Sequence, residues 1–209
     1  NKTTVIPFLN LNHPLSLKKT IALGKKGKLF LIPVPIAETD FSTLPEYVIQ
    51  HIHRIDHFIV ERARTSRRFI KSTGYEGRIE DLRFTELNKR DPARLPSQLF
   101  DPVFEGKDMG LMSEAGMPGI ADPGALVVKK AHELDIEVVP LIGPSSIFLS
   151  LAASGLNGQQ FCFHGYLPVK KPTLIQKLTQ IDKRIQQSGE TQLFIETPYR
   201  NESLFQSIL

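Results

Sequence analysis

The chain has 209 residues, 41% of them hydrophobic, with a formal net charge of +4 and a single cysteine, Cys162. This length allows one large domain or two small ones with real cores, and one cysteine excludes a framework of intramolecular disulfides. No apolar run approaches the ~18 residues of a membrane span, and the first residues lack a signal-peptide pattern, so we expect a globular cytoplasmic protein.

Most of the excess positive charge lies in the first 37 residues. They contain six lysines and no acidic residue, which leaves 20 basic against 22 acidic residues in the rest of the chain. An electrostatic argument for nucleic-acid binding must therefore rest on local patches rather than on net charge. Residues 1–27 show no steady period and are predicted to be a basic N-terminal extension, either a leader or an arm that holds a phosphate backbone.

Strands and helices are predicted to alternate after this extension. Short apolar runs indicate buried strands, and Pro33-Val34-Pro35 ends the first of them because proline cannot donate to a sheet ladder. His51 and His53 point to different sides of a predicted helix and no acidic or cysteine residue completes a ligand set, so no metal site is predicted. The predicted strands are 28–32, 57–60 and 84–87, and the predicted helices are 46–54, 62–71 and 92–104.

The helix predicted over 62–71 carries a strongly basic face. Arg64, Arg68 and Lys71 recur at the spacing i, i+4, i+7, and Arg67 lies beside them. Such a face is commonly no more than solvated. It is also the best candidate in the body of the chain for a surface that contacts RNA phosphates.

The segment between 109 and 124 joins a predicted strand to a predicted helix through a loop rich in glycine and proline. The strand is 109–112 and the helix is 125–131, with Asp122 as its expected N-cap and Pro123 at its first position. Loops at the carboxyl ends of parallel strands commonly form ligand sites, although a capped strand-to-helix connection explains this composition equally well. The segment matches neither common phosphate-binding glycine motif, which disfavours a dinucleotide or nucleoside-triphosphate fold.

A second loop of this kind follows a strand predicted over 136–141. Gly143-Pro144-Ser145-Ser146 precedes a helix predicted over 147–153, so backbone N–H groups and two hydroxyls are available to a polar ligand or to ordinary capping. After a polar linker, 155–160, the chain resumes with strands at 161–163 and 191–195 and helices at 173–187 and around 204–208. We predict an α/β protein with a mainly parallel N-terminal sheet, domains at 28–154 and 161–209, and a C-terminal domain that is too small to close a sheet alone.

Five motifs in order carry a resemblance to a known family. They are Ile32-Pro33-Val34-Pro35-Ile36, Ser113-Glu114-Ala115-Gly116-Met117-Pro118 with Ala121-Asp122-Pro123-Gly124, Val139-Pro140-Leu141-Ile142-Gly143-Pro144-Ser145-Ser146, Phe161-Cys162-Phe163-His164-Gly165-Tyr166-Leu167-Pro168 and Glu196-Thr197-Pro198-Tyr199-Arg200. Together they resemble the ribosomal RNA small-subunit methyltransferase I family of the tetrapyrrole methylase superfamily. The resemblance implies a two-domain α/β protein, usually a homodimer, that binds S-adenosylmethionine and methylates the ribose 2′-oxygen of a cytidine in small-subunit rRNA.

The same resemblance assigns roles to individual residues. The implied cofactor-binding residues are Pro35, Ala115, Gly116, Met117, Ile120, Ser145, Ser146, Glu196 and Thr197. Glu114 and Glu196 are the candidates for orienting the acceptor hydroxyl or taking its proton, with His164 third. The candidate substrate-binding residues are Arg64, Arg67, Arg68, His164 and Tyr166.

This sequence departs from the family pattern in three places. Ala37 and Glu38 replace the usual Gly-Asn of a Pro-Ile-Gly-Asn turn, His164 stands where the family has an acidic residue, and the remaining C-terminal strands are not in the sequence. Two alternatives therefore stay open. One is a methyltransferase that acts on a tetrapyrrole or another small acceptor, and the other is a cofactor-binding or RNA-binding protein without turnover.

Overall fold

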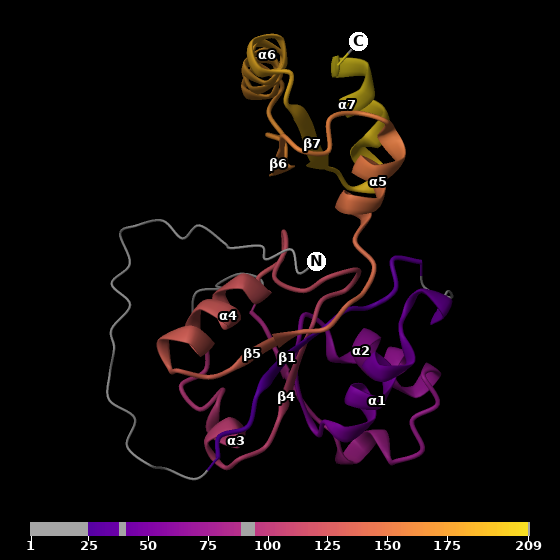
Figure 1. The fold of residues 1–209 in the computed structure, drawn as a ribbon, viewed down its shortest axis with the longest axis vertical. Coiled ribbons are helices and arrows are strands. Elements are labelled where there is room, and N and C mark those ends of the chain that lie inside the picture. Colours follow the sequence, from indigo (N-terminus) through magenta and orange to yellow (C-terminus); the bar gives the residue numbers. More distant parts are fainter. Residues whose placement is uncertain (1–24, 38–40, 89–94, 209) are drawn as a thin grey trace.

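The computed structural model describes residues 25–37, 41–88 and 95–208 (Figure 1). Within these ranges the strands are β1 (Leu29–Ile32), β2 (His57–Val60), β3 (Arg83–Glu86), β4 (Met109–Met112), β5 (Val138–Pro140), β6 (Phe161–Tyr166) and β7 (Thr191–Ile195). The helices are α1 (Glu46–Arg54), α2 (Ala63–Ser72), α3 (Asp101–Phe104), α4 (Gly124–Glu133), α5 (Ser146–Ser154), α6 (Lys171–Ser188) and α7 (Asn201–Ile208). Three short 3₁₀ turns are η1 (Phe41–Thr43), η2 (Ile79–Asp81) and η3 (Pro198–Arg200). None of the described helices is both long and apolar enough to cross a membrane.

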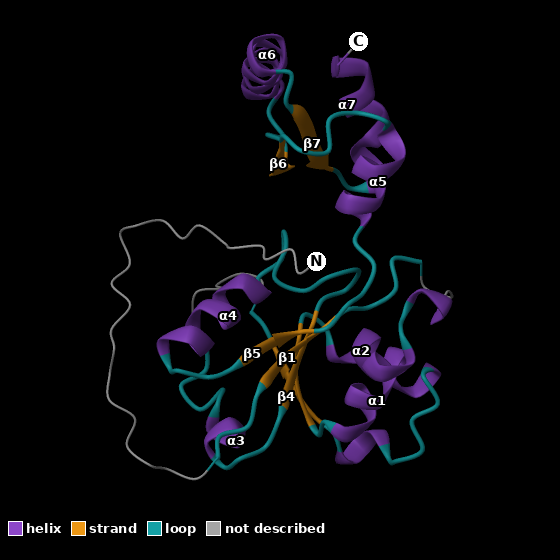
Figure 2. Cartoon of the chain, viewed as in Figure 1, coloured by secondary structure: helices purple, strands orange, loops and turns teal. Residues whose placement is uncertain are grey.

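The first five strands form one parallel sheet in the order β3-β2-β4-β1-β5. Helices α1 and α2 cover one face of this sheet, and α3 and α4 cover the other (Figure 2). Parallel strands need such crossovers, so both faces of the sheet are covered and its central strands β1, β2 and β4 are mainly apolar, whereas the edge strand β3 is partly polar and has exposed ends. The predicted α/β fold with a mainly parallel first sheet is confirmed.

Successive side chains of β1 pack alternately into the cores on the two faces of the sheet. Phe30 and Ile32 pack in the core with α1 and α2, whereas Leu29 packs in the core with α3 and α4. Gly110 on the neighbouring strand leaves the space that these large side chains use, since a Cβ there would lie 2.6 Å from Cδ1 of Ile32 and 2.9 Å from Cδ1 of Phe58. The centre of the sheet is therefore packed too closely to accept even one added methyl group without a shift.

The strand order places three loops at one edge of the sheet. From β1 the chain runs to β2 and β3, returns to place β4 beside β1, and then adds β5 on the other side of β1. Because all five strands are parallel, the loops that follow β4, β1 and β5 leave three adjacent strands at their carboxyl ends. A reversal of strand order of this kind is where open α/β sheets usually bind ligands.

The remaining elements form a second group. Strands β6 and β7 pair in parallel as a two-stranded sheet, and α5 contacts it, with Phe148 edge-on to Phe161 at 6.1 Å between ring centroids. Its small core consists of Leu167, Leu174, Ile181 and Leu204. Large apolar side chains stay exposed on this group, among them Phe148, Leu149 and Phe205. Two strands are fewer than a sheet needs for stability on its own, and the division into domains at 28–154 and 161–209 stays a prediction.

Four predicted elements have the predicted bounds, namely α1, β2, β4 and β7. The helix predicted over 92–104 is wrong in extent: only Asp101–Phe104 is helical, residues 89–94 lie outside the described residues, and 97–100 form turns. Two prolines account for the difference. Pro96 keeps the residue before it out of helical backbone, and Pro102 has no N–H to continue a helical ladder from residue 98, so 97–100 form a turn in which Leu99 N–H bonds to the carbonyl of Pro96. Strand β6 runs three residues past its predicted end, through a bulge that includes Gly165 at φ +64°.

Candidate functional site

The loop after β1 and the loop after β4 are joined by a pair of backbone hydrogen bonds. Val34 N–H donates to the carbonyl of Gly116, and Gly116 N–H donates to the carbonyl of Val34, each over 3.0 Å. Gly116 is buried and has φ +68°, in the left-handed region that favours glycine. The sequence Pro33-Val34-Pro35 leaves Val34 as the one residue of the three with an N–H to donate.

The loop after β5 packs against the same two loops. A Cβ on Gly143 would lie 2.2 Å from Cβ of Pro33, and a Cβ on Gly116 would lie 3.4 Å from the carbonyl oxygen of Pro144. The hydroxyl of Tyr47, on α1, accepts a hydrogen bond from Ile142 N–H at 2.7 Å. Glycine at 116 and 143 thus lets three backbones meet at the carboxyl edge of the sheet.

Asp122 organises the second half of the loop after β4. Its carboxylate accepts hydrogen bonds from Gly119 N–H at 2.9 Å and from Gly124 N–H at 2.7 Å. Burial raises the pKa of Asp122, and the two N–H donors act in the opposite direction. Helix α4 begins at Gly124 with Pro123 as N-cap, so the predicted N-cap at Asp122 is wrong by one residue, although its carboxylate still accepts from the first N–H of the helix.

Seven of the nine residues that the family resemblance assigns to the cofactor lie in these three loops or at the first residue of α5. Gly116 and Pro35 are buried in the contact between loops, while Ala115 and Ile120 are exposed. Ser145 is half-buried and Ser146 opens α5. The seven residues are Pro35, Ala115, Gly116, Met117, Ile120, Ser145 and Ser146.

Glu114 is held by the junction between β2 and α2. The hydroxyl of Thr65 donates to Oε1 of Glu114 at 2.7 Å, and Glu114 N–H donates to Oε1 of Glu61 at 3.2 Å. Nε of Arg62 lies 3.9 Å from Oε2 of Glu114. Sequence analysis found none of these partners, because they lie about fifty residues from Glu114 and no local pattern connects them.

Glu196 lies in the second group, at the end of β7, and its side chain is only 4% exposed. Oε1 accepts from Thr197 N–H at 2.8 Å, and Nη1 of Arg200 lies 3.0 Å from Oε2. The contact with Arg200 is an ion pair rather than a hydrogen bond, since Oε2 has no hydrogen-bond partner of good geometry. The carboxylate is therefore compensated by a charge and keeps one acceptor oxygen that no donor uses.

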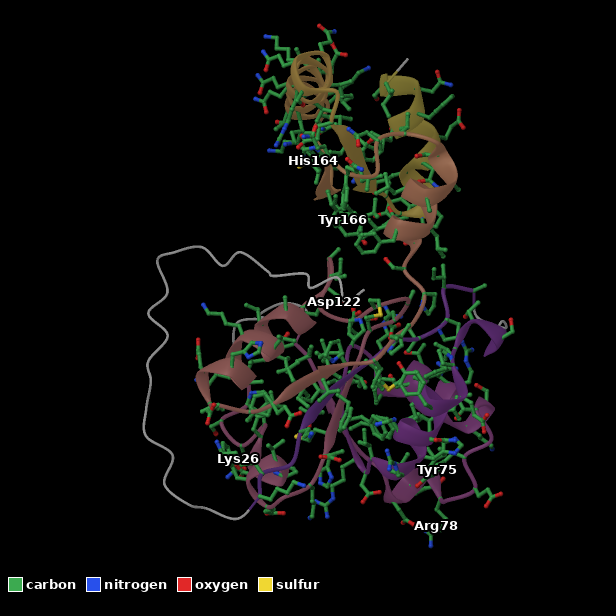
Figure 3. The ribbon with its side chains drawn as sticks, viewed as in Figure 1. Lys26, Tyr75, Arg78, Asp122, His164 and Tyr166 are labelled. Atoms are coloured by element: carbon green, nitrogen blue, oxygen red, sulfur yellow. The ribbon has the colours of Figure 1, made fainter. Side chains whose placement is uncertain are left out.

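His164 and Tyr166 also belong to the second group (Figure 3). Nε2 of His164 lies 2.7 Å from Oε1 of Gln192, a distance at which the imidazole N–H donates to the amide oxygen. Tyr166 is 56% exposed. The partner of His164 is thus a neutral side chain on the neighbouring strand.

The basic face predicted on α2 points to solvent. Ala63, Ser66 and Ile70 are the buried residues of this helix, and the arginines lie on its other sides. The guanidinium of Arg67 stacks over Phe84, 4.9 Å from the ring centroid. The exposed basic residues are Arg64, Arg67, Arg68 and Lys71.

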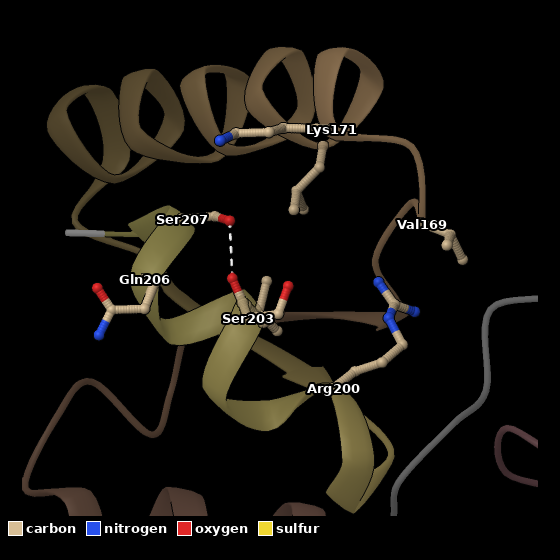
Figure 4. A pocket seen from close by; sticks show the side chains of 8 residues that line it. Val169, Lys171, Arg200, Ser203, Gln206 and Ser207 are labelled. Carbon is tan, nitrogen blue, oxygen red and sulfur yellow. Dashed lines mark hydrogen bonds between the residues drawn. The ribbon is translucent and has the colours of Figure 1, made fainter.

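Two hollows lie in the second group. The first, of about 450 Å³, lies between α6 and α7 (Figure 4) and is lined by Val169, Lys171, Leu174, Arg200, Ser203, Leu204, Gln206 and Ser207. The second, of about 520 Å³, is mainly apolar and includes Glu196 in its lining. Among the described residues, no group of three or more His, Cys, Asp or Glu side chains is placed to hold a metal ion.

The fold and these loops define an α/β protein with a candidate ligand-binding site at the carboxyl edge of a parallel sheet. Comparison with known proteins narrows this class of protein. No family model matches the chain. It is 33% identical over 183 residues to ribosomal RNA small subunit methyltransferase I of Streptococcus pyogenes serotype M6, covering 88% of this chain and 60% of that protein. It is 29% identical over 177 residues to the protein of the same name from Escherichia coli O157:H7, covering 85% of this chain and 58% of that protein. It is 28% identical over 179 residues to that of Buchnera aphidicola subsp. Schizaphis graminum, covering 86% and 59%.

These relatives bear the name of the family that the five motifs predict, so the family resemblance is confirmed. The chain spans about 60% of the length of the curated relatives it matches.

Replacing Asp122 by Ala is expected to lower the free energy of unfolding by about 1–3 kcal/mol, since two backbone N–H groups of a half-buried loop lose their acceptor. Asp122→Asn keeps one acceptor oxygen and should lose less. Urea unfolding of the three proteins followed by circular dichroism measures the difference. Equal stability of the Ala variant and the wild type would contradict this account of the loop.

The same variants have an expected pH dependence. Because the pKa of Asp122 is raised above its usual 3.8, the native state binds the proton more tightly than the unfolded chain does. Its contribution to stability is present below pH 3.8 and is lost as pH rises through the raised pKa. The stability of the wild type relative to Asp122→Asn should therefore fall over that range, and a difference that does not change with pH would contradict the shift.

Proposed function

We propose that this chain provides the S-adenosylmethionine site of a methyltransferase that acts on small-subunit rRNA, with the ribose 2′-oxygen of a cytidine as acceptor. The observation that carries the proposal is the meeting of three loops through the Val34–Gly116 hydrogen bonds and the Gly143–Pro33 contact. Those loops and the first residue of α5 hold seven of the nine residues that the family resemblance assigns to the cofactor. The names of the relatives supply the substrate class.

The residues present fit such a cofactor. Gly116 has no side chain at the point where the loops meet, and its N–H and carbonyl are both bonded to Val34, so a ligand would approach the loop beside the exposed Ala115. Ala115 is small and Ile120 offers an exposed apolar surface, which suits an uncharged ring or a thioether-like chain. Ser145 and Ser146 add hydroxyls at the start of α5. When bound, the cofactor would supply a sulfonium methyl group that an acceptor oxygen displaces in line.

The chain contributes chiefly by positioning. Holding the acceptor oxygen, methyl carbon and sulfur in line and away from water can supply roughly 7–11 kcal/mol of the barrier, whereas a general base adds typically about 10²–10⁴-fold. Glu114 accepts a hydrogen bond from Thr65, and Glu196 is ion-paired with Arg200. These contacts favour loop-holding and ligand-binding roles for both carboxylates over proton transfer, and the acceptor proton then leaves late, to water.

The acceptor side of the site is proposed to include the basic face of α2 and the second group's His164 and Tyr166. Arg64, Arg67 and Arg68 are exposed on one helix, as a phosphate-contacting surface requires. We further propose that the protein acts as a homodimer in the cytoplasm, where ribosomal subunits are modified.

Transfer of a labelled methyl group tests the function directly. The protein is incubated with tritiated S-adenosylmethionine and small ribosomal subunits, naked rRNA or a tetrapyrrole precursor. Label is expected in rRNA, at a ribose after digestion to nucleosides. Label found in the tetrapyrrole alone would refute the rRNA substrate, and label in none of them despite measurable cofactor binding would refute turnover by this chain.

Gly116→Val is expected to weaken binding of S-adenosylmethionine at least tenfold. The change puts a branched side chain at φ +68° beside the carbonyl of Pro144 and strains the hydrogen bonds to Val34. Gly74→Val is the matched control, because Gly74 has φ +82° with open space around it and follows α2, away from the three loops. Calorimetric titration should show normal affinity in the control. Normal affinity in Gly116→Val as well would exclude this loop as the cofactor site.

Replacing Arg64, Arg67 and Arg68 together by Gln should weaken RNA binding and flatten its dependence on salt. Loss of three phosphate contacts reduces the slope of log K against log salt by about 2 for a single strand. The triple Lys variant keeps the charge and should keep most of the slope, and cofactor affinity should not change in either protein. Filter binding at several salt concentrations measures the slope, and a slope equal to that of the wild type would mean that this face is only solvated.

A further inference from the structure

Glu114 makes two hydrogen bonds to one short segment, the junction between β2 and α2. Its backbone N–H donates to Glu61 at 3.2 Å, and its side chain accepts from the hydroxyl of Thr65 at 2.7 Å. Glu61 directly follows β2, and Thr65 lies in the first turn of α2. Strands β2 and β4 are neighbours in the sheet, so the segment that bonds to Glu114 follows the strand next to the one that leads into Glu114.

The hydroxyl of Thr65 has one proton and two acceptors within reach. The carbonyl of Arg62 lies at 3.0 Å and Oε1 of Glu114 at 2.7 Å. A carboxylate is the stronger acceptor and is the nearer one here, so the proton belongs to the bond with Glu114. This bond connects the helix to the loop, whereas the alternative would stay within the first turn of the helix.

Two residues further along the chain the loop is fixed again. Gly116 exchanges two hydrogen bonds with Val34, and the buried Ser113 donates through its hydroxyl to the carbonyl of Ala115 at 3.1 Å. Ala115 therefore lies between an anchor on α2 and an anchor on the loop after β1. The orientation of its peptide groups depends on both anchors, because moving either one rotates them.

We propose that Thr65 is a positioning residue for the cofactor site: its hydroxyl holds Glu114 so that the backbone of Ala115 and Gly116 is aligned for the ligand. This inference rests on the proposed function. It assigns Glu114 the role of a loop anchor, and it gives α2 a second role beside its basic face. Thr65 does not itself touch the ligand and acts through Glu114.

Two substitutions at one position provide the test. Thr65→Val keeps the size and branching of threonine but removes the hydroxyl, and Thr65→Ser keeps the hydroxyl. The Val variant should bind S-adenosylmethionine about tenfold more weakly, because binding must then order the loop that the Thr65–Glu114 hydrogen bond holds in the ligand-free wild type. In methyl transfer its KM for the cofactor should rise with kcat little changed, and Thr65→Ser should restore affinity to within about twofold of the wild type.

Hydrogen exchange tests the anchor without any ligand. The Gly116 amide of the Val variant should exchange at least several-fold faster than in the wild type, while the Met109 amide, which donates to the carbonyl of Lys28 at the other end of β4, should not change. A double variant, Thr65→Val with Glu114→Ala, should bind cofactor no worse than Glu114→Ala alone, because both changes break the same contact.

The outcomes separate this inference from the function on which it rests. If the wild type binds no S-adenosylmethionine, the proposed function fails, and exchange of the Gly116 amide still decides whether Thr65 anchors the loop. If the wild type binds the cofactor and Thr65→Val binds it equally well with unchanged exchange at Gly116, the positioning role is wrong. Failure of Thr65→Ser to restore affinity, or additive losses in the double variant, would also overturn it.

Discussion

The pair of hydrogen bonds between Val34 and Gly116 is the contact on which the rest of the site depends. It connects two loops that leave adjacent strands, and the third loop packs on the same two loops, with Gly143 against Pro33 and Pro144 beside Gly116. Gly116 is left-handed at this contact, and the prolines on either side of Val34 leave neither neighbouring residue with an N–H to take its place. Loosening this contact would separate the loops while leaving the sheet below them intact.

The two groups of elements differ in how completely they bury their apolar side chains. The five-stranded sheet has a closed core on each face, and its loops are held by side chains of its own helices, such as Tyr47 and Thr65. The two-stranded group has a small core, with large apolar residues such as Phe205 left exposed. The first group therefore provides a rigid support for the loops. The residues proposed for the acceptor side lie partly on the second group, whose core is smaller.

The roles of the three carboxylates in the site depend on the groups that surround them. Glu114, Asp122 and Glu196 each stand in a loop of the family motifs, and each already has a partner: a hydroxyl, two backbone N–H groups or a guanidinium. These partners hold each carboxylate in one orientation against the group that it contacts. Their common contribution is to hold backbone in place, which agrees with a reaction whose barrier is lowered mainly by geometry.

The sequence by itself determined the class of fold and the loops that matter. Buried strands such as β2 and β4 are short apolar runs between turn residues, and Gly116 and Pro118 mark a loop of fixed shape. Local sequence patterns therefore predict both the strands and the loop. The predicted bounds of α3 were wrong because Pro96 and Pro102 interrupt the helix that the apolar spacing suggests, and the predicted end of β6 was wrong because a bulge breaks the strand pattern. Only the tertiary structure decided that Thr65 holds Glu114, that Tyr47 holds Ile142, and that Gly143 faces Pro33. These contacts join residues some 50 to 110 positions apart, brought together by the order in which the strands are placed in the sheet, and that order has no signature in any short stretch of the chain.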